Sequence, residues 1–483
     1  MSLFDHEARQ FKFDVLKEVS KRAFEGKLNE DVCDEVANLL IPGKRADFRC
    51  CIYKEKEIIR ERTRMAMGKP PVPTQHNNER QIVRVLDAAC DGCSIHKIQV
   101  TDNCRKCMAK ACLSACKFDA IKMGNDQAFI DYDKCKECGA CKNACPFNAI
   151  VETQRPCMKS CPVDAISMDE NNYALIDEEK CINCGACQAK CPFGAIEDIS
   201  WMVPVIDELN KGTKMYAVFA PAIQGQFDEA TLPQIMESIR QLGFEEVYEA
   251  AIGADAVAWY EKQDAIAHKK EGKKITTSCC PAFVNMAKQH FPTVYETNVS
   301  HMVSPMVAIT RYLKHHHPDA KVVFIGPCVA KKQETLDSEV DYCLTFEELG
   351  AMFVSKNISV ENVTPRSEDT ASCYARNFSI GGGVSKAVAQ AAGECGDEET
   401  LVAQYADGSL ECKKALLMMK VNRFNADILE GMACAGGCIC GPATIESAPK
   451  AKSRMAKENV VLKDKTIAST LETFDFTDID LHR

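Results

Sequence analysis

The chain has 483 residues, of which 46% are hydrophobic, and it carries a formal net charge of −10. This length predicts two to four domains with a substantial buried core, and the negative charge argues against a nucleic-acid-binding protein. The sequence begins with a charged stretch at Asp5–Arg9 and contains no apolar run long enough for a signal peptide or a membrane helix. We therefore expect a cytoplasmic protein that does not enter a membrane.

The 29 cysteines are the most unusual part of this composition. In a reducing compartment they are not expected to form structural disulfides. Most of them lie two or three residues from another cysteine, a spacing that isolated buried thiols do not show. Closely spaced cysteines without other ligand types favour iron–sulfur clusters or zinc.

Residues 1–85 contain few cysteines and are predicted to form a helical N-terminal segment. Two groups of apolar residues have helical spacing there: Phe11, Val15, Leu16 and Val19, and then Val32, Val36, Leu39 and Leu40. Nothing in this segment indicates a chemical function.

Residues 86–200 are dense in cysteine and internally repetitive. One short phrase occurs four times, each time directly after a cysteine: Lys117–Ile121, Pro146–Ile150, Pro162–Ile166 and Pro192–Ile196. This self-similarity indicates that small units have been duplicated.

Two stretches of this region follow the cysteine pattern of bacterial ferredoxins, in which three closely spaced thiolates bind one [4Fe-4S] cluster and a fourth serves a neighbouring cluster. They are Cys135, Cys138, Cys141 and Cys145, and Cys181, Cys184, Cys187 and Cys191. A looser version of this pattern is formed by Cys104, Cys107, Cys112 and Cys116. Cys157 and Cys161 match only the second half of the pattern, and Cys90 and Cys93 form an additional pair. A zinc ribbon would offer two isolated pairs instead.

The number of accessory clusters is between two and four. The 16 cysteines of these motifs suffice for four clusters, which is the number we expect. In that arrangement Cys90 and Cys93 share a cluster with two cysteines from the later motifs. If Cys90 and Cys93 are plain thiols, there are three clusters or fewer. Several clusters in a row indicate electron transport between a redox centre and a soluble carrier.

The segment between Cys104 and Cys145 is locally basic, with eight basic residues against five acidic ones. On an acidic protein, such a patch is either a surface that guides an acidic electron carrier or an ordinary solvated face.

From Lys214 onward, short apolar runs alternate with helical stretches. Strands are predicted at 215–220, 246–250, 274–277 and 321–325, and helices at 232–242, 256–269 and 303–315. This alternation predicts mainly parallel sheets covered by helices over residues 201–445, followed by a charged tail at 446–483. The fold class is thus a multidomain α+β and α/β protein, with a helical N-terminal segment, ferredoxin-like iron–sulfur domains and a parallel-sheet domain.

Three loops of the parallel-sheet domain carry cysteines, at least two of them directly after predicted strands, where reactive loops are expected. The loops are Thr277–Pro281 with Cys279 and Cys280, Pro327–Cys328, and Cys434–Cys438. Thiolates placed in this way can hold one cluster and leave a sulfur to bridge to a second metal group. The three segments resemble the signature loops of the [FeFe]-hydrogenases, and the resemblance covers roughly residues 90–445.

The resemblance implies an H-cluster. Its [4Fe-4S] part would be held by Cys280, Cys328, Cys434 and Cys438, and Cys438 would bridge to a two-iron subsite with carbon monoxide, cyanide and azadithiolate ligands. Glycines beside these cysteines fit such a site, because the backbone must approach a cluster closely there. Four further residues are implied to contact the cofactor: Lys331, which would donate a charge-assisted hydrogen bond to cyanide, Met432, Pro221 and Ala222.

The resemblance also implies a proton path. Cys279 is expected to be a relay rather than a ligand, because a thiol can accept and release a proton near neutral pH. The path continues through Glu261 and Ser300. Asp264 and His268 follow, where the family carries glutamate and arginine. Glu261, Asp264 and His268 share one helix face, which without the cysteine loops would indicate a charged solvent stripe.

Four positions depart from the well-studied enzymes and suggest the group B branch of the family, of monomeric clostridial type. Gly326 replaces a methionine of those enzymes, and Phe283 replaces a tryptophan. Met306–Val307 stands where those enzymes have a polar glutamine that contacts the subsite, and Gly441–Pro442 replaces a pair of glycines. These changes alter the packing and polarity around the site, which tunes its potential and reactivity. The ligand set is unaffected.

The activity implied is that of a ferredoxin hydrogenase of anaerobic hydrogen metabolism, which forms H2 reversibly from two protons and two electrons. Its partners would be a ferredoxin-type electron carrier, H2 and protons, and the maturation proteins that install the subsite. Two alternatives stay open. A non-enzymatic iron–sulfur assembly protein of the same fold would lack the two-iron subsite and would not need Cys279, Lys331 and the acidic helix together. An H2 sensor would typically add a signalling domain, which the sequence does not show.

Overall fold

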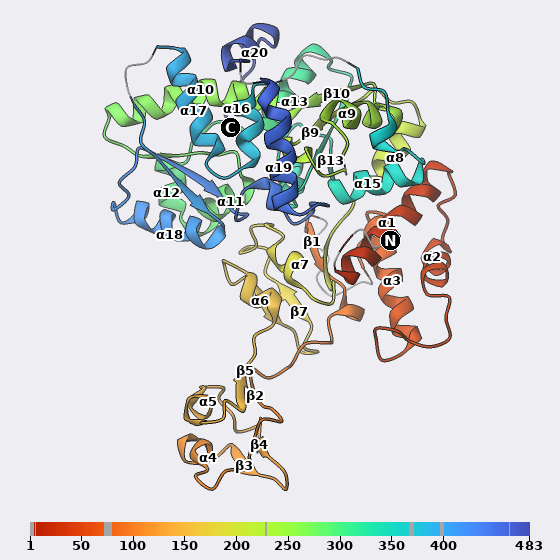
Figure 1. Cartoon of the computed structure of the whole chain (residues 1–483), viewed down its shortest axis with the longest axis vertical. Helices are drawn as coiled ribbons and strands as arrows, with labels where there is room; N and C mark the ends of the chain where they lie inside the picture. Colours follow the sequence, from red (N-terminus) through yellow and green to blue (C-terminus); the bar gives the residue numbers. More distant parts are fainter. Residues whose placement is uncertain are drawn as a thin grey trace.

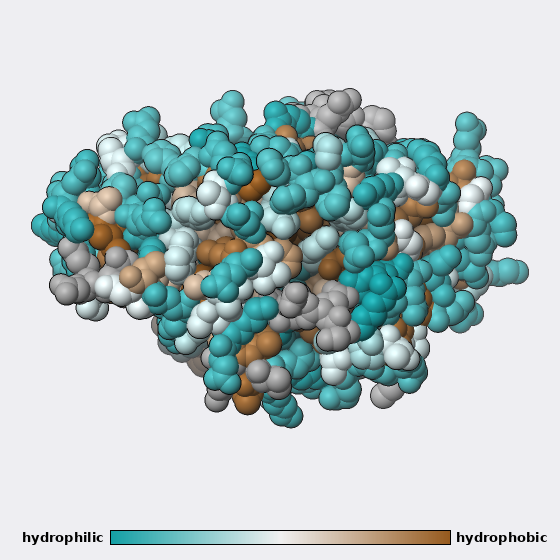
Figure 2. Space-filling view, turned by 90° about the horizontal axis from the view of Figure 1, so that it is seen from above, coloured by the Kyte–Doolittle hydropathy of each residue, from teal (hydrophilic) through white to brown (hydrophobic). Residues whose placement is uncertain are grey.

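The computed structural model describes residues 4, 6–71, 80–227, 229–366, 371–396, 400–462 and 464–483. A large upper body contains both parallel sheets, the N-terminal helices lie against its side, and a small lobe extends below it (Figure 1). Viewed from above, the body is covered mainly by hydrophilic residues, with apolar ones in small scattered groups (Figure 2). Among the described residues, no helix is both long and apolar enough to cross a bilayer.

The N-terminal segment forms three helices, α1 (Glu7–Phe24), α2 (Val32–Leu40) and α3 (Ile52–Ala66). The predicted apolar face of α1 is buried, and its Val15, Leu16 and Val19 are at most 2% exposed. In α2, Val32 and Val36 are buried as expected, but Leu39 is 51% exposed. The helix α3 was not predicted, because its sequence is mostly charged. It buries Ile58, Ile59 and Met65 together with the charged side chains of Glu55, Glu61 and Arg62. These charges interrupt the apolar pattern on which hydrophobic periodicity depends.

The four repeated phrases form four copies of one local structure. Each phrase ends in an isoleucine that begins a short strand, and the residue two positions before that isoleucine, three times Asp or Asn and once Gly, is left-handed with φ between 48° and 57°. Asn, Asp and Gly tolerate this conformation best. The four strands, each paired antiparallel with a partner, are β3 (Ile121–Met123) with β4 (Ala128–Ile130), β5 (Ile150–Glu152) with β2 (Ile98–Val100), β6 (Ile166–Met168) with β7 (Ala174–Ile176), and β8 (Ile196–Asp198) with β1 (Val83–Val85).

A one-turn-long helix precedes each phrase and carries cluster-motif cysteines: α4 (Ala111–Ala115), α5 (Ala140–Ala144), α6 (Pro156–Ser160) and α7 (Ala186–Lys190). The first two units, from β2 to β5, make up the extended lobe, which has its own small core around Ile98, Ile121 and Ile150. The other two units pack against the body through a core that includes Ile196 and Val329.

Two parallel sheets form the centre of the body. One has the order β10-β9-β12-β13 and the other β11-β15-β14. The strands are β9 (Met215–Phe219), β10 (Glu246–Glu249), β11 (Ile275–Thr276), β12 (Lys321–Gly326), β13 (Tyr342–Thr345), β14 (Ala403–Asp407) and β15 (Ile428–Met432). The four strands predicted from the sequence are confirmed as β9 to β12, and the fold class, which mixes helices with parallel sheets, is confirmed as well.

Helices cover these sheets. The three predicted helices are confirmed as α9 (Leu232–Gln241), α10 (Ala250–Lys270) and α13 (Pro305–His316). The remaining helices of the body are α8 (Met202–Asn210), α11 (Pro281–His290), α12 (Pro292–Asn298), α14 (Ala330–Leu336), α15 (Phe346–Ser355), α16 (Cys373–Arg376), α17 (Gly383–Glu394) and α18 (Ser409–Lys420). The C-terminal tail adds α19 (Ala448–Asn459) and α20 (Ile467–Thr473) and buries Met455 and Ile467 completely.

A buried charge network joins the three parts of the chain. The ammonium group of Lys332 in α14 is fully buried and lies 2.6 Å from Asp198 at the end of β8 and 3.2 Å from Glu348 in α15. Lys12 of α1 lies 2.8 Å from the same aspartate and 2.9 Å from Glu347. Although burial opposes ionisation, Lys12 and Lys332 hold the pKa of Asp198 far below its usual range.

Removal of Lys332 should destabilise the protein. In a Lys332→Met variant, Asp198 and Glu348 stay buried with less compensation, so the free energy of unfolding should fall by about 3–5 kcal/mol. The measurement is the urea midpoint of the circular dichroism signal. Lys27→Met is the control, because Lys27 pairs with Glu25 on the exposed surface, and its midpoint should match the unaltered chain. Equal midpoints for the two variants would show that the network adds no stability.

Candidate active site and electron relay

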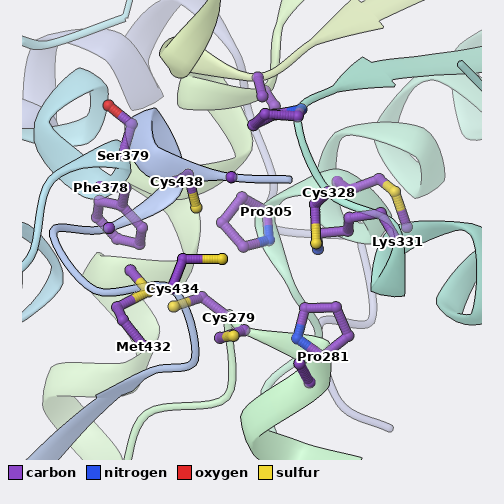
Figure 3. A pocket seen from close by; sticks show the side chains of 18 of the residues that line it. Cys279, Pro281, Pro305, Cys328, Lys331, Phe378, Ser379, Met432, Cys434 and Cys438 are labelled. Carbon is purple, nitrogen blue, oxygen red and sulfur yellow. The ribbon is translucent and has the colours of Figure 1, made fainter. Parts of the chain in front are cut away.

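The predicted cysteine loops meet at one cavity of about 90 Å³ between the two parallel sheets. Each loop leaves the carboxyl end of a strand: Cys279 and Cys280 follow β11, Cys328 follows β12 and Cys434 follows β15. In parallel sheets these ends lie on one side, so residues distant in sequence come together there. The sulfurs of Cys279, Cys328, Cys434 and Cys438 all point toward the cavity (Figure 3). Cys280 lines it as well.

The cavity wall is almost entirely apolar. Pro221, after β9, and Met432, at the end of β15, line it as predicted. Four further residues line it that no sequence pattern had indicated: Phe324, Pro305, Phe378 and Ser379. Ala222, in contrast, is fully buried and is not part of the cavity wall.

The glycines of the third loop are required by their surroundings. Gly436 and Gly437 have φ of +91° and +92°. A Cβ on Gly437 would lie 2.6 Å from the carbonyl oxygen of Ser379 and 2.7 Å from the backbone nitrogen of Gly381. The loop therefore packs tightly against residues 379–381, and this contact holds Cys434 and Cys438 in position.

Two of the sequence departures are explained by the packing beside the cavity. A side chain at Gly326 would meet the ring of Phe324 at 2.6 Å, and that ring lines the cavity. A Cβ on Gly431 would lie 2.3 Å from the ring of Phe283, so this ring fills the space beside β15. Met306 also lines the cavity and makes its wall less polar than a glutamine would.

The thiols at the cavity are poor anions in this environment. Burial and the neighbouring Cys280 raise the pKa of Cys328 to about 11, and burial raises the pKa values of Cys279, Cys434 and Cys438 well above their usual range. A metal centre is the group that stabilises clustered thiolates at neutral pH. The residues therefore fit an iron–sulfur cluster.

Lys331 is the only cation among the residues that line the cavity. Its ammonium group donates to the hydroxyl of Ser304 at 2.8 Å and to the carboxylate of Glu334 at 2.6 Å. Burial alone would lower the pKa of Lys331, but Glu334, Cys328 and Cys279 raise it above its usual value. Lys331 is thus a fixed positive charge at the edge of an apolar cavity.

Glu261 lies in α10 next to Cys279 and has unusual surroundings. It is 1% exposed, and neither carboxyl oxygen has a hydrogen-bond partner of good geometry among the described residues. Burial raises the pKa of Glu261 to about 8, and Asp264 adds to this effect, while Ser300 and Arg483 oppose it. A carboxyl group with this pKa carries a proton at neutral pH and can exchange it readily.

The outer residues of the predicted proton path lie on the same helix. Asp264 and His268 are partly exposed, and Nδ1 of His268 lies 2.8 Å from the backbone carbonyl oxygen of Asp264. Ser300 accepts a hydrogen bond from the backbone nitrogen of Met302 at 3.2 Å. The structure therefore arranges Cys279, Glu261 and Asp264 in the order in which the sequence predicts them, from the cavity toward the surface.

The accessory cysteines fall into four groups of three or four neighbouring thiols. Burial and the charges of Cys191, Cys90 and Cys93 raise the pKa of Cys157 to about 11, which places these four thiols together. Burial and the charges of Cys184, Cys181 and Cys161 raise the pKa of Cys187 well above its usual value, which places a second set of four thiols together. By the same criterion, Cys112 lies with Cys104 and Cys145, and Cys141 lies with Cys116 and Cys135.

Backbone amides also donate to these sulfurs. The amides of Ala120, Ala149, Ala165 and Ala195 lie 3.2–3.4 Å from the sulfur of the cysteine four residues earlier, once in each repeated phrase. Amide donors of this kind tune the potential of a cluster. In the described part of the chain, no three His, Cys, Asp or Glu side chains are close enough to bind one metal ion. A cubane does not require that, because each thiolate binds a separate iron.

The group around Cys184 adjoins the cavity. Cys184 is part of the cavity lining, and a Cβ on the next residue, Gly185, would lie 2.7 Å from the ring of Pro442 and 3.2 Å from Val329. The close approach of the two cysteine loops therefore needs a glycine at position 185.

Comparison with known proteins agrees with this arrangement. Residues 213–442 match the model of the C-terminal domain of the iron-only hydrogenase large subunit. Residues 151–202 match the iron–sulfur cluster-binding domain of LdpA, and residues 128–151 match a 4Fe-4S binding domain. The chain is therefore an [FeFe]-hydrogenase-like protein with ferredoxin-like iron–sulfur domains.

Individual relatives are distant. Iron hydrogenase 1 of Clostridium pasteurianum is 27% identical over 369 residues, which cover 65% of this chain and 64% of that protein, less than two thirds of its length. The periplasmic [Fe] hydrogenase large subunit of Nitratidesulfovibrio vulgaris is 28% identical over 68% of this chain and 89% of that subunit. A ferredoxin of Alicyclobacillus acidocaldarius is 42% identical over 55 residues, 11% of this chain and 70% of the ferredoxin. Among solved structures, apo [FeFe]-hydrogenase HydA1 of Chlamydomonas reinhardtii aligns with a TM-score of 0.47 at 20% identity, over 56% of this chain and 91% of that one.

The grouping of the thiols predicts the iron content. Full-length protein produced without subsite maturation should contain about 20 irons and about 20 sulfides, because four accessory cubanes and the cubane at the cavity have four of each. A Cys90→Ser, Cys93→Ser double variant should lose about four irons. The control is Cys50→Ser, Cys51→Ser, which alters another close pair that is exposed and should keep all of them. Full iron content in the first variant would contradict the grouping.

Proposed function

We propose that this chain is an [FeFe]-hydrogenase that interconverts H2 with two protons and two electrons. The observation that carries the proposal is a single apolar cavity that combines four convergent thiols, the additional thiol of Cys279 and the buried cation of Lys331. An ordinary electron-transfer cubane needs only four thiolates. The other two groups fit a site where a proton and an anionic ligand must be handled beside the cluster.

In this proposal, Cys280, Cys328, Cys434 and Cys438 hold an H-cluster. When bound, that cofactor supplies the iron and the amine base between which H2 is formed or split. The apolar wall excludes bulk water and strengthens electrostatic contacts. Lys331, oriented by Ser304 and Glu334, donates a charge-assisted hydrogen bond to an anionic ligand in the cavity.

The proton path is the second part of the proposal. The sulfur of Cys279 gives up or takes a proton at the cavity, and a carboxyl oxygen of Glu261 exchanges that proton with it. Ser300 lies beside Glu261, and Asp264 and His268 lead along α10 to the surface. The orphaned carboxyl oxygens of Glu261 support this role, because a buried carboxyl without fixed partners is free to change its hydrogen bond.

Electrons reach the cavity from the opposite direction. The order of the thiol groups supports a relay that runs from the lobe through the group with Cys157 and the group with Cys184. The expected partner is a ferredoxin-type carrier, and maturation proteins are needed to install the two-iron subsite. Placement in the group B branch rests on the four sequence departures alone.

The proposed activity requires more than cubanes. Protein matured with the two-iron subsite should show infrared bands of metal-bound carbon monoxide and cyanide, and should evolve H2 from reduced methyl viologen. Protein made without maturation should show neither, although its cubanes are present. Matured material that carries cubanes but no such bands would favour the assembly-protein alternative over an enzyme.

Cys279 should be essential for turnover but not for cofactor binding. Because a serine hydroxyl releases a proton far less readily than a thiol, Cys279→Ser should lower H2 evolution by roughly 100-fold or more and leave the infrared bands and the iron content unchanged. Cys395→Ser is the control, because Cys395 is exposed and is not one of the residues that line the cavity. Full activity of Cys279→Ser would rule out the relay.

A further inference from the structure

The two cysteine groups of the extended lobe are not equivalent in position. The lobe, residues 98–152, joins the body only through the chain segments that lead into β2 and out of β5 (Figure 1). The strands β2 and β5 therefore mark its inner end, next to the body. The hairpin β3–β4 and the helix α4 mark its outer end.

The group with Cys135 and Cys141 faces the inner end. Glu137, in the loop between Cys135 and Cys138, accepts a hydrogen bond at 2.8 Å from the backbone nitrogen of Lys97, directly before β2. Tyr132 stacks on His96, with ring centroids 3.5 Å apart and planes at 5°. His96 lies only three residues after Cys93, so this stack leads from the lobe toward the next thiol group in the body.

The group with Cys104, Cys107, Cys112 and Cys145 faces the outer end. The sulfur of Cys104 accepts a hydrogen bond from the backbone nitrogen of Ala128 in β4 at 3.4 Å. These four cysteines line one small cavity together with Met123 and Ala128 of the outer hairpin. A cluster in this position is the farthest of the relay from the active-site cavity, so it is the terminal member.

The surface around this outer group has an apolar centre and basic neighbours. Met108, beside Cys107, is 98% exposed, and Phe147, which lines the same small cavity, is 48% exposed. Arg105 and Lys106 lie between Cys104 and Cys107, and both are exposed. Neither forms an ion pair with any residue in the described ranges. An exposed methionine and aromatic ring with a charged rim are typical of protein interfaces.

The charge of the lobe is concentrated at this end. Residues 102–126 contain five basic and three acidic side chains, whereas residues 131–142 contain three of each. The chain as a whole carries −10. An acidic partner is therefore repelled by most of the molecule and attracted to the outer end of the lobe, which is the arrangement that steers association to one site.

We propose that an acidic electron-carrier protein docks on the outer end of the lobe, over Arg105, Lys106 and Met108. It transfers one electron to the cluster held by Cys104, Cys107, Cys112 and Cys145. The carrier is oxidised by one electron and the cluster is reduced by one, and no bond is formed or broken. This inference rests on the proposed function, because a relay needs a terminus only if its other end consumes or supplies electrons.

The test measures electron transfer into the cubanes alone. Full-length protein with its cubanes, made without subsite maturation, is mixed in a stopped-flow instrument with a reduced, acidic two-cluster ferredoxin, and cluster reduction is followed by its absorbance. The Arg105→Glu, Lys106→Glu variant should lower the second-order rate constant about tenfold at low salt. Reduction by dithionite, a small reductant that needs no docking surface, should be unchanged.

The matched control is Lys134→Glu, Lys136→Glu, which makes the same change in charge beside the inner group. Its rate constant should stay within about threefold of the unaltered protein. Glutamate is compatible with the outer loop, because Glu137 already occupies the equivalent left-handed position in the inner loop, with φ of 52° against 46° for Lys106. Iron content checks that each variant keeps its clusters, and the milder Arg105→Gln, Lys106→Gln variant should still slow the reaction about threefold.

Met108→Ser tests the apolar centre and should lower the rate constant without changing its dependence on salt. Equal slowing by the outer and inner double variants, or no slowing by either, would overturn the proposed docking surface. The readout does not involve H2. If matured protein makes no H2 while the outer variant alone slows cluster reduction, the proposed function fails and the docking surface stands.

Discussion

The structure depends on the confinement of several thiols in spaces that do not tolerate uncompensated negative charge. At the central cavity, burial keeps the pKa values of Cys328, Cys434 and Cys438 so high that none of them is an anion at neutral pH without a positive centre beside it. Binding of iron reverses this situation, because metal coordination releases the thiol protons and replaces them with a larger charge. Metal binding is therefore expected to be coupled to the folding of this region.

The same constraint explains the tight packing around the cysteine loops. A cluster can replace the lost hydration of its thiolates only if the loops stay in place, and here they are held by contacts that require glycine. Gly437 packs on the backbone of residues 379–381, and Gly185 packs on Pro442. The contact between Gly185 and Pro442 also holds the thiol group around Cys184 beside the cavity. One packing interaction therefore sets both the position of the cysteine loops and the distance that an electron travels to the cavity. At Gly326 and Gly431, the space that a larger side chain would occupy is filled by an aromatic ring. The ring of Phe324 lies against Gly326, and the ring of Phe283 lies against Gly431.

The sequence predicted the parts of the structure that depend on local patterns. The strands β9 and β12 are continuous apolar runs, and the cluster motifs have fixed spacings, so both were predictable. The apolar face of α3 was not, because it is interrupted by charged residues whose partners lie in other segments, such as Glu197 for Arg62. Phe378 and Ser379 could not be assigned to the cavity, since only tertiary contacts, such as the one with the loop at Gly437, bring them to its wall. The partners of Cys90 and Cys93 were left open for the same reason, and the structure places Cys157 and Cys191 with them.

Under the proposed function, electrons and protons approach the cavity from different sides. Electrons arrive by way of Cys184, which lies on the side of the ferredoxin-like units, and protons arrive by way of Cys279 and Glu261 in the helical layer. An apolar cavity makes any unbalanced charge costly. Each added electron therefore raises the affinity of the site for a proton, and each added proton favours the next electron. Glu261, protonated at neutral pH because its pKa is about 8, can supply that proton without a charged group having to enter the cavity. Lys331 stays in place throughout, because Ser304 and Glu334 hold its ammonium group. Its positive charge offsets the anionic ligand set, and the charges of the added electron and the added proton can then compensate each other.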